Sequence, residues 1–273
     1  MKIGLCQMNT QDDKARNLEM AETAIDQLAA QGADLVVLPE MFNFLGLDED
    51  KIINAEPIPG PSIDRLQQKA KEKKIFLHCG SILEKEGDRI FNATVVFNRE
   101  GKRVAFYRKI HLFDVEIPGG IVYKESAVVT PGREIVTFDC EGVTVGLSIC
   151  YDLRFPELYR SLVDRGALLI LIPAAFTLMT GKDHWEPLIR ARAIENVCYV
   201  AACGQWGSHP VGNQCYGHSM VVNPWGTVLA QARDGVTTVF AELDFDYLHE
   251  VRAKLPALQH RRRDIFGDFS QVK

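Results

Sequence analysis

The alternation of apolar and polar positions is clearest in the stretch from Val143 to Cys150. Branched apolar side chains alternate there with small or polar ones, which predicts a strand ending at the cysteine. Pro156 then stands near the first position of a helical pattern. A cysteine on a strand-to-helix turn lies beside free backbone N–H groups, the geometry that acyl-transfer enzymes use to hold an oxyanion. A buried core cysteine fits the same pattern, so other parts of the chain must decide between the two.

The rest of the chain predicts strands and helices in alternation. Expected strands cover 2–9, 35–38, 75–83, 91–98, 103–109, 167–176, 198–204 and 237–243, with a hairpin over 217–232. Expected helices run from 14 to a stop at Gly32, from the turn-rich segment 57–62 to about 73, and over 156–165, 183–196 and 247–254. No linker or repeat interrupts them, so we expect one domain over 1–273. This order predicts an α/β fold with mixed sheets and helices outside.

Three reactive residues each follow an expected strand: Glu40, Lys109 and Cys150. Open α/β folds gather their sites at such strand ends, so we expect these side chains to meet. A free thiol has a pKa of about 8.5 and is mostly protonated at pH 7, so a carboxylate that takes its proton makes it a better nucleophile. An ammonium group stabilises first the thiolate and then the oxyanion. Together the three form a candidate thiol-hydrolase site, although a Glu–Lys pair can also be purely structural.

Histidines offer a different base. His111, His184 or His218 is the alternative partner for Cys150, and sequence spacing does not choose among them. A structural zinc site is disfavoured, because no C-x2-C spacing occurs among the candidate ligands Cys198, Cys203, His209, Cys215 and His218. We therefore expect no metal and no cofactor.

Composition narrows the class of protein. The chain has a net charge of −5 and a pI near 5.8, which argues against a nucleic-acid partner. Its hydrophobic content of 47% and charged content of 25% are ordinary for a globular enzyme. It has an odd count of seven cysteines, no signal-peptide pattern and no apolar run near the ~18 residues of a membrane span. We therefore expect a cytoplasmic protein with free thiols and no membrane partner.

Motifs along nearly the whole chain resemble those of one family. They occur in the order LPEMFNF, YRKIHLFDVEIPG, GLSICYDLRFPE, AFTLMTGKDHWEPLIRARAIEN and YGHSMVVNPWG. These blocks are similar to the signature blocks of the nitrilase, or carbon–nitrogen hydrolase, superfamily. The resemblance implies a four-layer αββα sandwich and assembly as a homodimer or larger homo-oligomer. It also favours the Glu–Lys–Cys reading of the site over a Cys–His pair.

Site residues carry over from the resemblance by position. It implies that Glu40, Lys109 and Cys150 are the catalytic triad and that Glu125, in YKES, helps to position the lysine and the substrate. We expect the backbone N–H of Tyr151 to share the oxyanion with Lys109.

The substrate follows from details of the motifs. DVEIPG, CYDLRFPE, TGKDHWE and LPALQHRRRDIF most resemble the Nit branch of the superfamily. Enzymes of that branch hydrolyse the terminal amide of small α-keto acid compounds, such as deaminated glutathione and α-ketoglutaramate, so we expect an amidase that releases an acid and ammonia through a Cys thioester. A nitrile or N-carbamoyl hydrolase, and a binding scaffold without activity, remain alternatives.

Such substrates carry carboxylates, so a cation is expected near the site. Arg154, four residues after the cysteine, is the candidate, although it could instead pair with Asp152 or Glu157 and hold the turn. Thr177 and Phe42 are candidates to line the pocket.

Overall fold

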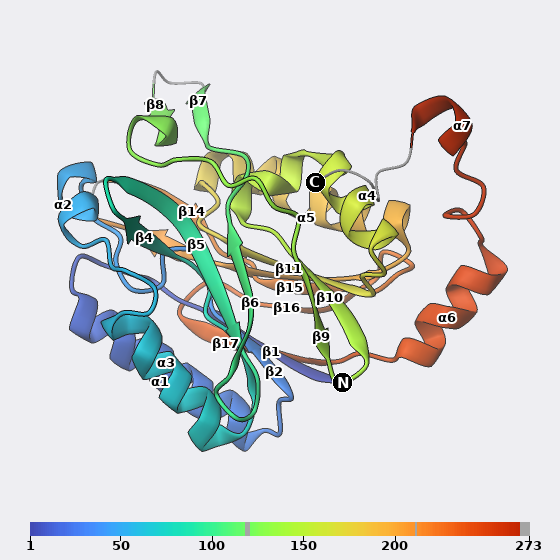
Figure 1. Ribbon diagram of the computed structural model, residues 1–273, viewed down its shortest axis with the longest axis horizontal. Helices are drawn as coiled ribbons and strands as arrows, with labels where there is room; N and C mark the ends of the chain where they lie inside the picture. Colours follow the sequence, from blue (N-terminus) through green and yellow to red (C-terminus); the bar gives the residue numbers. More distant parts are fainter. Residues whose placement is uncertain (118–120, 211, 268–273) are drawn as a thin grey trace.

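Two β-sheets packed face to face form the middle of the fold (Figure 1). The structure is a computed structural model that describes residues 1–117, 121–210 and 212–267. Pro118 and Gly119, which close the DVEIPG motif, and residues 268–273 of the expected domain lie outside the described residues.

Both sheets mix parallel and antiparallel strands. The first has the order β17 (Thr237–Glu242), β1 (Lys2–Gln7), β2 (Leu35–Val37), β3 (Phe76–His78), β5 (Arg89–Phe97), β4 (Ile82–Glu86), with β6 (Arg103–Arg108) also pairing β5. The second has the order β16 (Val228–Gln231), β15 (Met220–Val222), β12 (Tyr199–Gly204), β11 (Leu169–Ala174), β10 (Val143–Leu147), β9 (Thr137–Cys140). The neighbours β1–β2–β3 and β10–β11–β12 run parallel. Their carboxyl ends therefore lie at one edge of each sheet.

Helices cover the outer faces of both sheets. Figure 1 shows α1 (Lys14–Ala30) and α3 (Pro61–Lys73) on one side, and α4 (Pro156–Asp164) and α5 (Leu178–Asn196) on the other. The smaller elements are α2 (Asp48–Ile53), α6 (Phe245–Lys254), α7 (Arg263–Phe266), and the hairpins β7 (Asp114–Ile117) with β8 (Ile121–Lys124) and β13 (Trp206–Ser208) with β14 (Gln214–Tyr216). No helix within the described ranges combines the length and apolar character that crossing a bilayer requires.

The alternation along β1 explains the layers. Ile3 and Leu5 point into the core between the sheets, whereas Cys6 lies in the second core under α1 and α3. Gly4 faces α1 so closely that a Cβ would come 2.7 Å from the side chain of Leu28. The buried strands have two apolar faces. Helices therefore cover one face of each sheet, and the other sheet covers the second face. The expected four-layer αββα fold is confirmed.

One expected strand is divided in the structure. The strand expected over 75–83 is two strands, because the chain turns at Gly80 with φ +57°. A Cβ at Gly80 would lie 2.0 Å from the carbonyl oxygen of Pro39, so only glycine allows this approach to the loop that carries Glu40.

The helix expected over 183–196 begins earlier, at Leu178. Gly181 weakens the helical pattern of the first turn in the sequence. Packing requires this glycine, since a Cβ there would come 2.3 Å from the side chain of Tyr216. The unexpected elements α2 and β7–β8 are too short for a periodic pattern to reveal them.

Candidate active site

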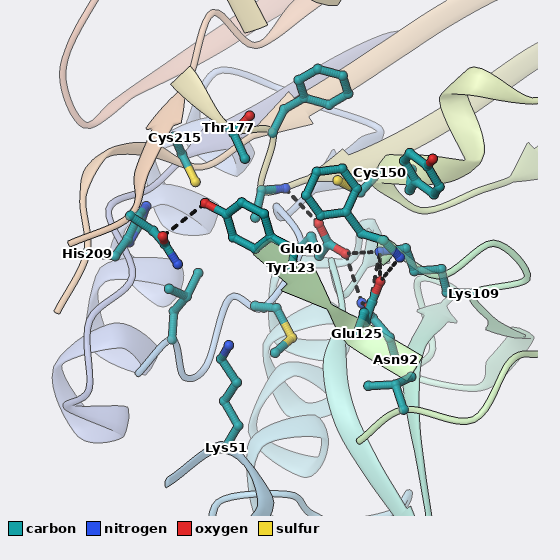
Figure 2. A pocket seen from close by; sticks show the side chains of 18 of the residues that line it. Glu40, Lys51, Asn92, Lys109, Tyr123, Glu125, Cys150, Thr177, His209 and Cys215 are labelled. Carbon is teal, nitrogen blue, oxygen red and sulfur yellow. Dashed lines mark hydrogen bonds and ion pairs between the residues drawn. The ribbon is translucent and has the colours of Figure 1, made fainter. Parts of the chain in front are cut away.

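Glu40, Lys109 and Cys150 come together at the carboxyl ends of three strands from both sheets (Figure 2). Glu40 follows β2, Lys109 follows β6 and Cys150 follows β10. All three side chains are buried, and all three line one pocket. The strand ends therefore bring the three side chains together, as expected.

The Glu40 carboxylate is the centre of the hydrogen-bond network. Its Oε1 accepts from Nζ of Lys109 at 3.0 Å and from Nδ2 of Asn92 at 2.8 Å. Its Oε2 accepts from the backbone N–H of Ala175 at 2.7 Å. The thiol of Cys150 lines the same pocket, close enough for the charge of this carboxylate to act on it. One carboxylate thus binds the ammonium group and acts on the thiol.

Glu125 is the second carboxylate on Lys109. Its two oxygens lie 3.1 and 2.9 Å from Nζ, and its Oε2 accepts from the backbone N–H of Phe113 at 2.7 Å. Asn92 links the two carboxylates, since its Nδ2 also lies 3.3 Å from Glu125. Asn92 was not among the site residues expected from the sequence. The only sign of its role there is that it is a polar residue within the apolar strand β5.

Charges in this cluster set two protonation states. Burial disfavours the charged form of Lys109, but Glu125 and Glu40 outweigh burial and raise the pKa of this amine well above its ordinary value. Burial, and next the negative Glu40, raise the pKa of the Cys150 thiol well above 9.0, against the opposing effect of Lys109. At neutral pH the lysine is therefore a cation and the thiol keeps its proton next to a carboxylate that can receive it.

Cys150 begins a 3₁₀ turn, Cys150–Arg154, rather than closing the strand. Its φ of 47° is a left-handed conformation that few non-glycine residues adopt. The N–H of Tyr151 is one of the first in the turn, where N–H groups have no partner within the turn itself. Tyr151 lines the same pocket as the thiol.

Asp152 holds this turn in place. Its fully buried carboxylate accepts from the hydroxyl of Tyr107 at 2.6 Å and from the N–H of Ile149 at 2.8 Å. It also accepts from the backbone and ring nitrogens of His111 at 3.0 and 2.7 Å. One side chain therefore ties the cysteine turn to strand β6, which Lys109 follows.

We expect Asp152→Ala to lower the free energy of unfolding by about 3–5 kcal/mol, because buried donors lose their acceptor. Urea denaturation measures this loss. Asp234→Ala is the matched control, since Asp234 also pairs with a histidine, His218 at 3.3 Å, but is 77% exposed; its cost should stay below about 1 kcal/mol. Equal costs for the two substitutions would contradict the anchoring role.

The pocket is a cavity of about 380 Å³. Its walls come from segments far apart in the sequence, including Lys51 of α2, Tyr123 and Lys124 of β8, and Thr177. Thr177 precedes α5 and its hydroxyl lies 2.7 Å from that of Thr180. In Figure 2 the amine of Lys51 points into the pocket. The cavity is large enough for a small organic substrate.

Two expected pocket residues lie elsewhere. Phe42 is fully buried in the core under α1 and α3, while its neighbour Met41 lines the pocket. The left-handed φ of 56° at Met41 changes the direction of the chain there. Arg154 is also outside the lining: its guanidinium stacks over Phe176, 5.3 Å from the ring centroid, and lies 3.3 Å from the ring of His184. The expectation that Phe42 lines the pocket is therefore not met, whereas the role of Arg154 as a cation near the site stays a prediction.

The three histidines considered as bases lie outside the pocket lining as well. His111 binds Asp152, His184 lies against Arg154, and His218 lies near Asp234. The histidine that does line the pocket is His209. Within the described residues, no group of three or more His, Cys, Asp or Glu side chains is arranged to hold a metal ion.

Known proteins are similar to this chain in sequence and in fold. The sequence profile of the family described as carbon-nitrogen hydrolase matches residues 2–253. A bovine (Bos taurus) protein named deaminated glutathione amidase is 41% identical over 97% of this chain and 83% of its own length. The human (Homo sapiens) omega-amidase NIT2 is 40% identical over 97% of this chain and 96% of its own. The crystal structure of Saccharomyces cerevisiae Nit3, of branch 10 of the nitrilase superfamily, matches with a TM-score of 0.87 and 34% identity over 96% of both chains.

Proposed function

This chain belongs to the carbon–nitrogen hydrolase family, and we propose that it cleaves amides with Cys150 as nucleophile, Glu40 as proton carrier and Lys109 as the stabilising cation. Its membership makes it a carbon–nitrogen hydrolase, and its similarity to amidases supports action on amides. The assignment of roles rests on one observation: the Glu40 carboxylate hydrogen-bonds the amine of Lys109, and its charge acts on the buried thiol of Cys150 in the same pocket.

The first half of the reaction forms a thioester. Glu40 takes the thiol proton while the sulfur bonds to the amide carbon, and the carbonyl electron pair moves onto oxygen. Lys109 and the N–H of Tyr151 hold this oxyanion, with Glu125 keeping the lysine in place. The C–N bond then breaks, and protonated Glu40 returns its proton to the departing nitrogen.

The second half releases the acid. Glu40 accepts a proton from water, whose oxygen bonds to the thioester carbon. The C–S bond breaks, and Cys150 regains its proton from Glu40. Each proton that Glu40 receives is returned, so the enzyme ends in its starting state.

We propose a deaminated glutathione-like compound as the substrate, with α-ketoglutaramate as the alternative. The first compound is in the name of a similar protein, deaminated glutathione amidase; the second is what the resemblance to the Nit branch implies, and another similar protein is named omega-amidase. Both compounds carry carboxylates, and the cations Lys51 and Lys124 line the pocket where Arg154 does not. Ammonia is the product from the primary amide of α-ketoglutaramate. The amide bonds of a glutathione skeleton are secondary, so cleaving one releases an amine, and the expected release of ammonia applies to α-ketoglutaramate and not to deaminated glutathione.

The experiment is a side-by-side assay of these two compounds with product identification by mass spectrometry. We expect kcat/KM to be at least about tenfold higher for deaminated glutathione. A preference for α-ketoglutaramate would make the protein an omega-amidase. Hydrolysis of neither, with turnover of nitriles or N-carbamoyl compounds, would contradict the proposed substrate class. Inertness towards all of them would favour a binding scaffold.

We further propose a single domain, cytoplasmic location and assembly as a homodimer or larger homo-oligomer. All seven cysteines are free thiols, which suits a reducing compartment. The assembly follows the resemblance to the family, and sedimentation of the purified protein measures it.

A further inference from the structure

The peptide that joins Glu40 to Met41 is held at both of its polar groups by buried side chains. Its carbonyl oxygen accepts a hydrogen bond from Nε2 of Gln205 at 3.0 Å, and its N–H donates to Oγ of Ser81 at 3.1 Å. Ser81 and Gln205 are both fully buried. Ser81 precedes β4 of the first sheet and Gln205 follows β12 of the second, so each sheet supplies one of the two partners.

The backbone is strained at this peptide. The φ of Met41 is 56°, in the left-handed region that residues with a side chain rarely adopt. Rotation of the peptide plane changes ψ of Glu40 and φ of Met41 together, and would let Met41 leave that region. The same rotation would turn the C=O and N–H away from their partners. The two hydrogen bonds therefore oppose the movement that the strain favours.

Both partners are themselves fixed. Oε1 of Gln205 accepts from the backbone N–H of Thr10 at 3.0 Å, and its Nε2 also donates to the hydroxyl of Thr10 at 2.6 Å. Ser81 is held through its backbone, since its N–H donates to the carbonyl of Pro39 at 3.2 Å and its carbonyl accepts from the N–H of Phe42 at 3.1 Å. Neither side chain can follow the peptide if the peptide rotates.

We propose that Ser81 and Gln205 are positioning residues for the proton transfer: by holding the Glu40–Met41 peptide, they keep the Glu40 carboxylate in the place where it serves the thiol and the ammonium group. This role rests on the proposed function, in which Glu40 carries the proton, and deepens it. Neither Ser81 nor Gln205 is among the described residues that line the pocket, so they act through Glu40 and not on the substrate. A catalytic group displaced by about 1 Å can cost about 10²-fold in rate.

Ser81→Ala tests this role, because it removes the acceptor of the Met41 N–H and leaves the backbone contacts of Ser81 in place. We expect kcat for the preferred amide to fall by about 10–10²-fold while KM changes by less than about threefold. Ser161→Ala is the matched control. It removes another buried serine hydroxyl, 2% exposed and bonded to the carbonyl of Glu157 in α4, and should change kcat by less than about twofold. Equal losses in the two variants would overturn the proposal.

The double variant separates positioning from a general loss of structure. Glu40→Gln has no proton carrier left to position, so adding Ser81→Ala to it should lower kcat by less than about twofold further. Gln205→Met removes the donor on the other side of the peptide and should behave in the same way, with a loss of kcat alone and none on top of Glu40→Gln. A second full loss in either double variant would overturn the proposal.

A readout without turnover distinguishes this proposal from the proposed function. The charge of Glu40 raises the pKa of the Cys150 thiol, so a displaced carboxylate should lower the thiol midpoint, measured as the absorbance difference from Cys150→Ala. An unchanged midpoint in Ser81→Ala would overturn the positioning role, even in an enzyme that hydrolyses amides. A lowered midpoint in a protein that hydrolyses none of the proposed amides would support the positioning of Glu40 and refute the function.

Discussion

Replacing Cys150 by alanine is expected to abolish amide hydrolysis and leave the protein folded. Loss of a nucleophile lowers kcat by about 10⁴-fold or more, because no thioester can form. The substitution removes one buried sulfur atom and no charge, so the fold has little reason to change. Turnover of the preferred amide and the unfolding midpoint of both proteins measure the two halves of this prediction.

Cys215→Ala is the control for this experiment. Cys215 is the other thiol in the pocket lining, and burial followed by the charge of Glu40 raises its pKa. Mass spectrometry of enzyme quenched during turnover should find the acyl group on Cys150 in both the wild type and Cys215→Ala. Turnover that persists in Cys150→Ala, or an acyl group on Cys215, would contradict the assignment.

Glu40→Gln is expected to lower kcat by about 10²–10⁴-fold, the usual contribution of a general acid–base group. The amide has nearly the shape of the carboxylate but does not take up a proton. Lys109 keeps Glu125 as a partner, at 2.9 Å, so its charge stays paired. Steady-state kinetics on the preferred substrate measure the loss.

The same variant should lower the pKa of the Cys150 thiol, although it slows the reaction. The negative charge of Glu40 raises the pKa of Cys150, and Lys109 lowers it. Removing Glu40 while keeping Lys109 therefore lowers that pKa and makes the thiolate more abundant at neutral pH. Thiolate absorbance measured against pH should show a titration midpoint at lower pH than in the wild type. A slower enzyme with an unchanged or higher thiol midpoint would contradict this account of the site.

Glu125→Gln is the matched comparison, because it also removes one carboxylate from Lys109. Glu125 is not among the largest influences on the pKa of the Cys150 thiol. We expect a loss of about tenfold in kcat and no shift in the thiol midpoint. Equal effects of the two substitutions would mean that Glu40 acts only by positioning the lysine.

Much of the fold was readable from the sequence. Local periodicity indicated β1, α1 and β2 closely, because each buries one face or two against neighbours and therefore shows a regular apolar pattern. The errors lie where tertiary contacts override local preference. Gly80 divides an expected strand because it passes against Pro39, and Gly181 stays inside a helix because Tyr216 leaves no room for a side chain.

The site was predictable only in part. Residues that end a strand and carry reactive groups stand out in a sequence, which is why Glu40, Lys109 and Cys150 were candidates. Phe42 looked equally suitable, but the turn at Met41 directs it into the core. Arg154 is close to Cys150 in sequence, yet it packs outside the pocket, on Phe176.

The sequence by itself determined the family, the layered α/β architecture and the reactive residues, because these depend on periodicity, turn chemistry and motifs that are local in the chain. Tertiary structure alone decided which groups meet. Asn92 bridges Glu40 and Glu125, and among the described residues no group hydrogen-bonds Nε2 of His209. Such contacts join residues tens to more than a hundred positions apart. Burial and hydrogen-bond partners at that range are set by packing, which no local pattern encodes.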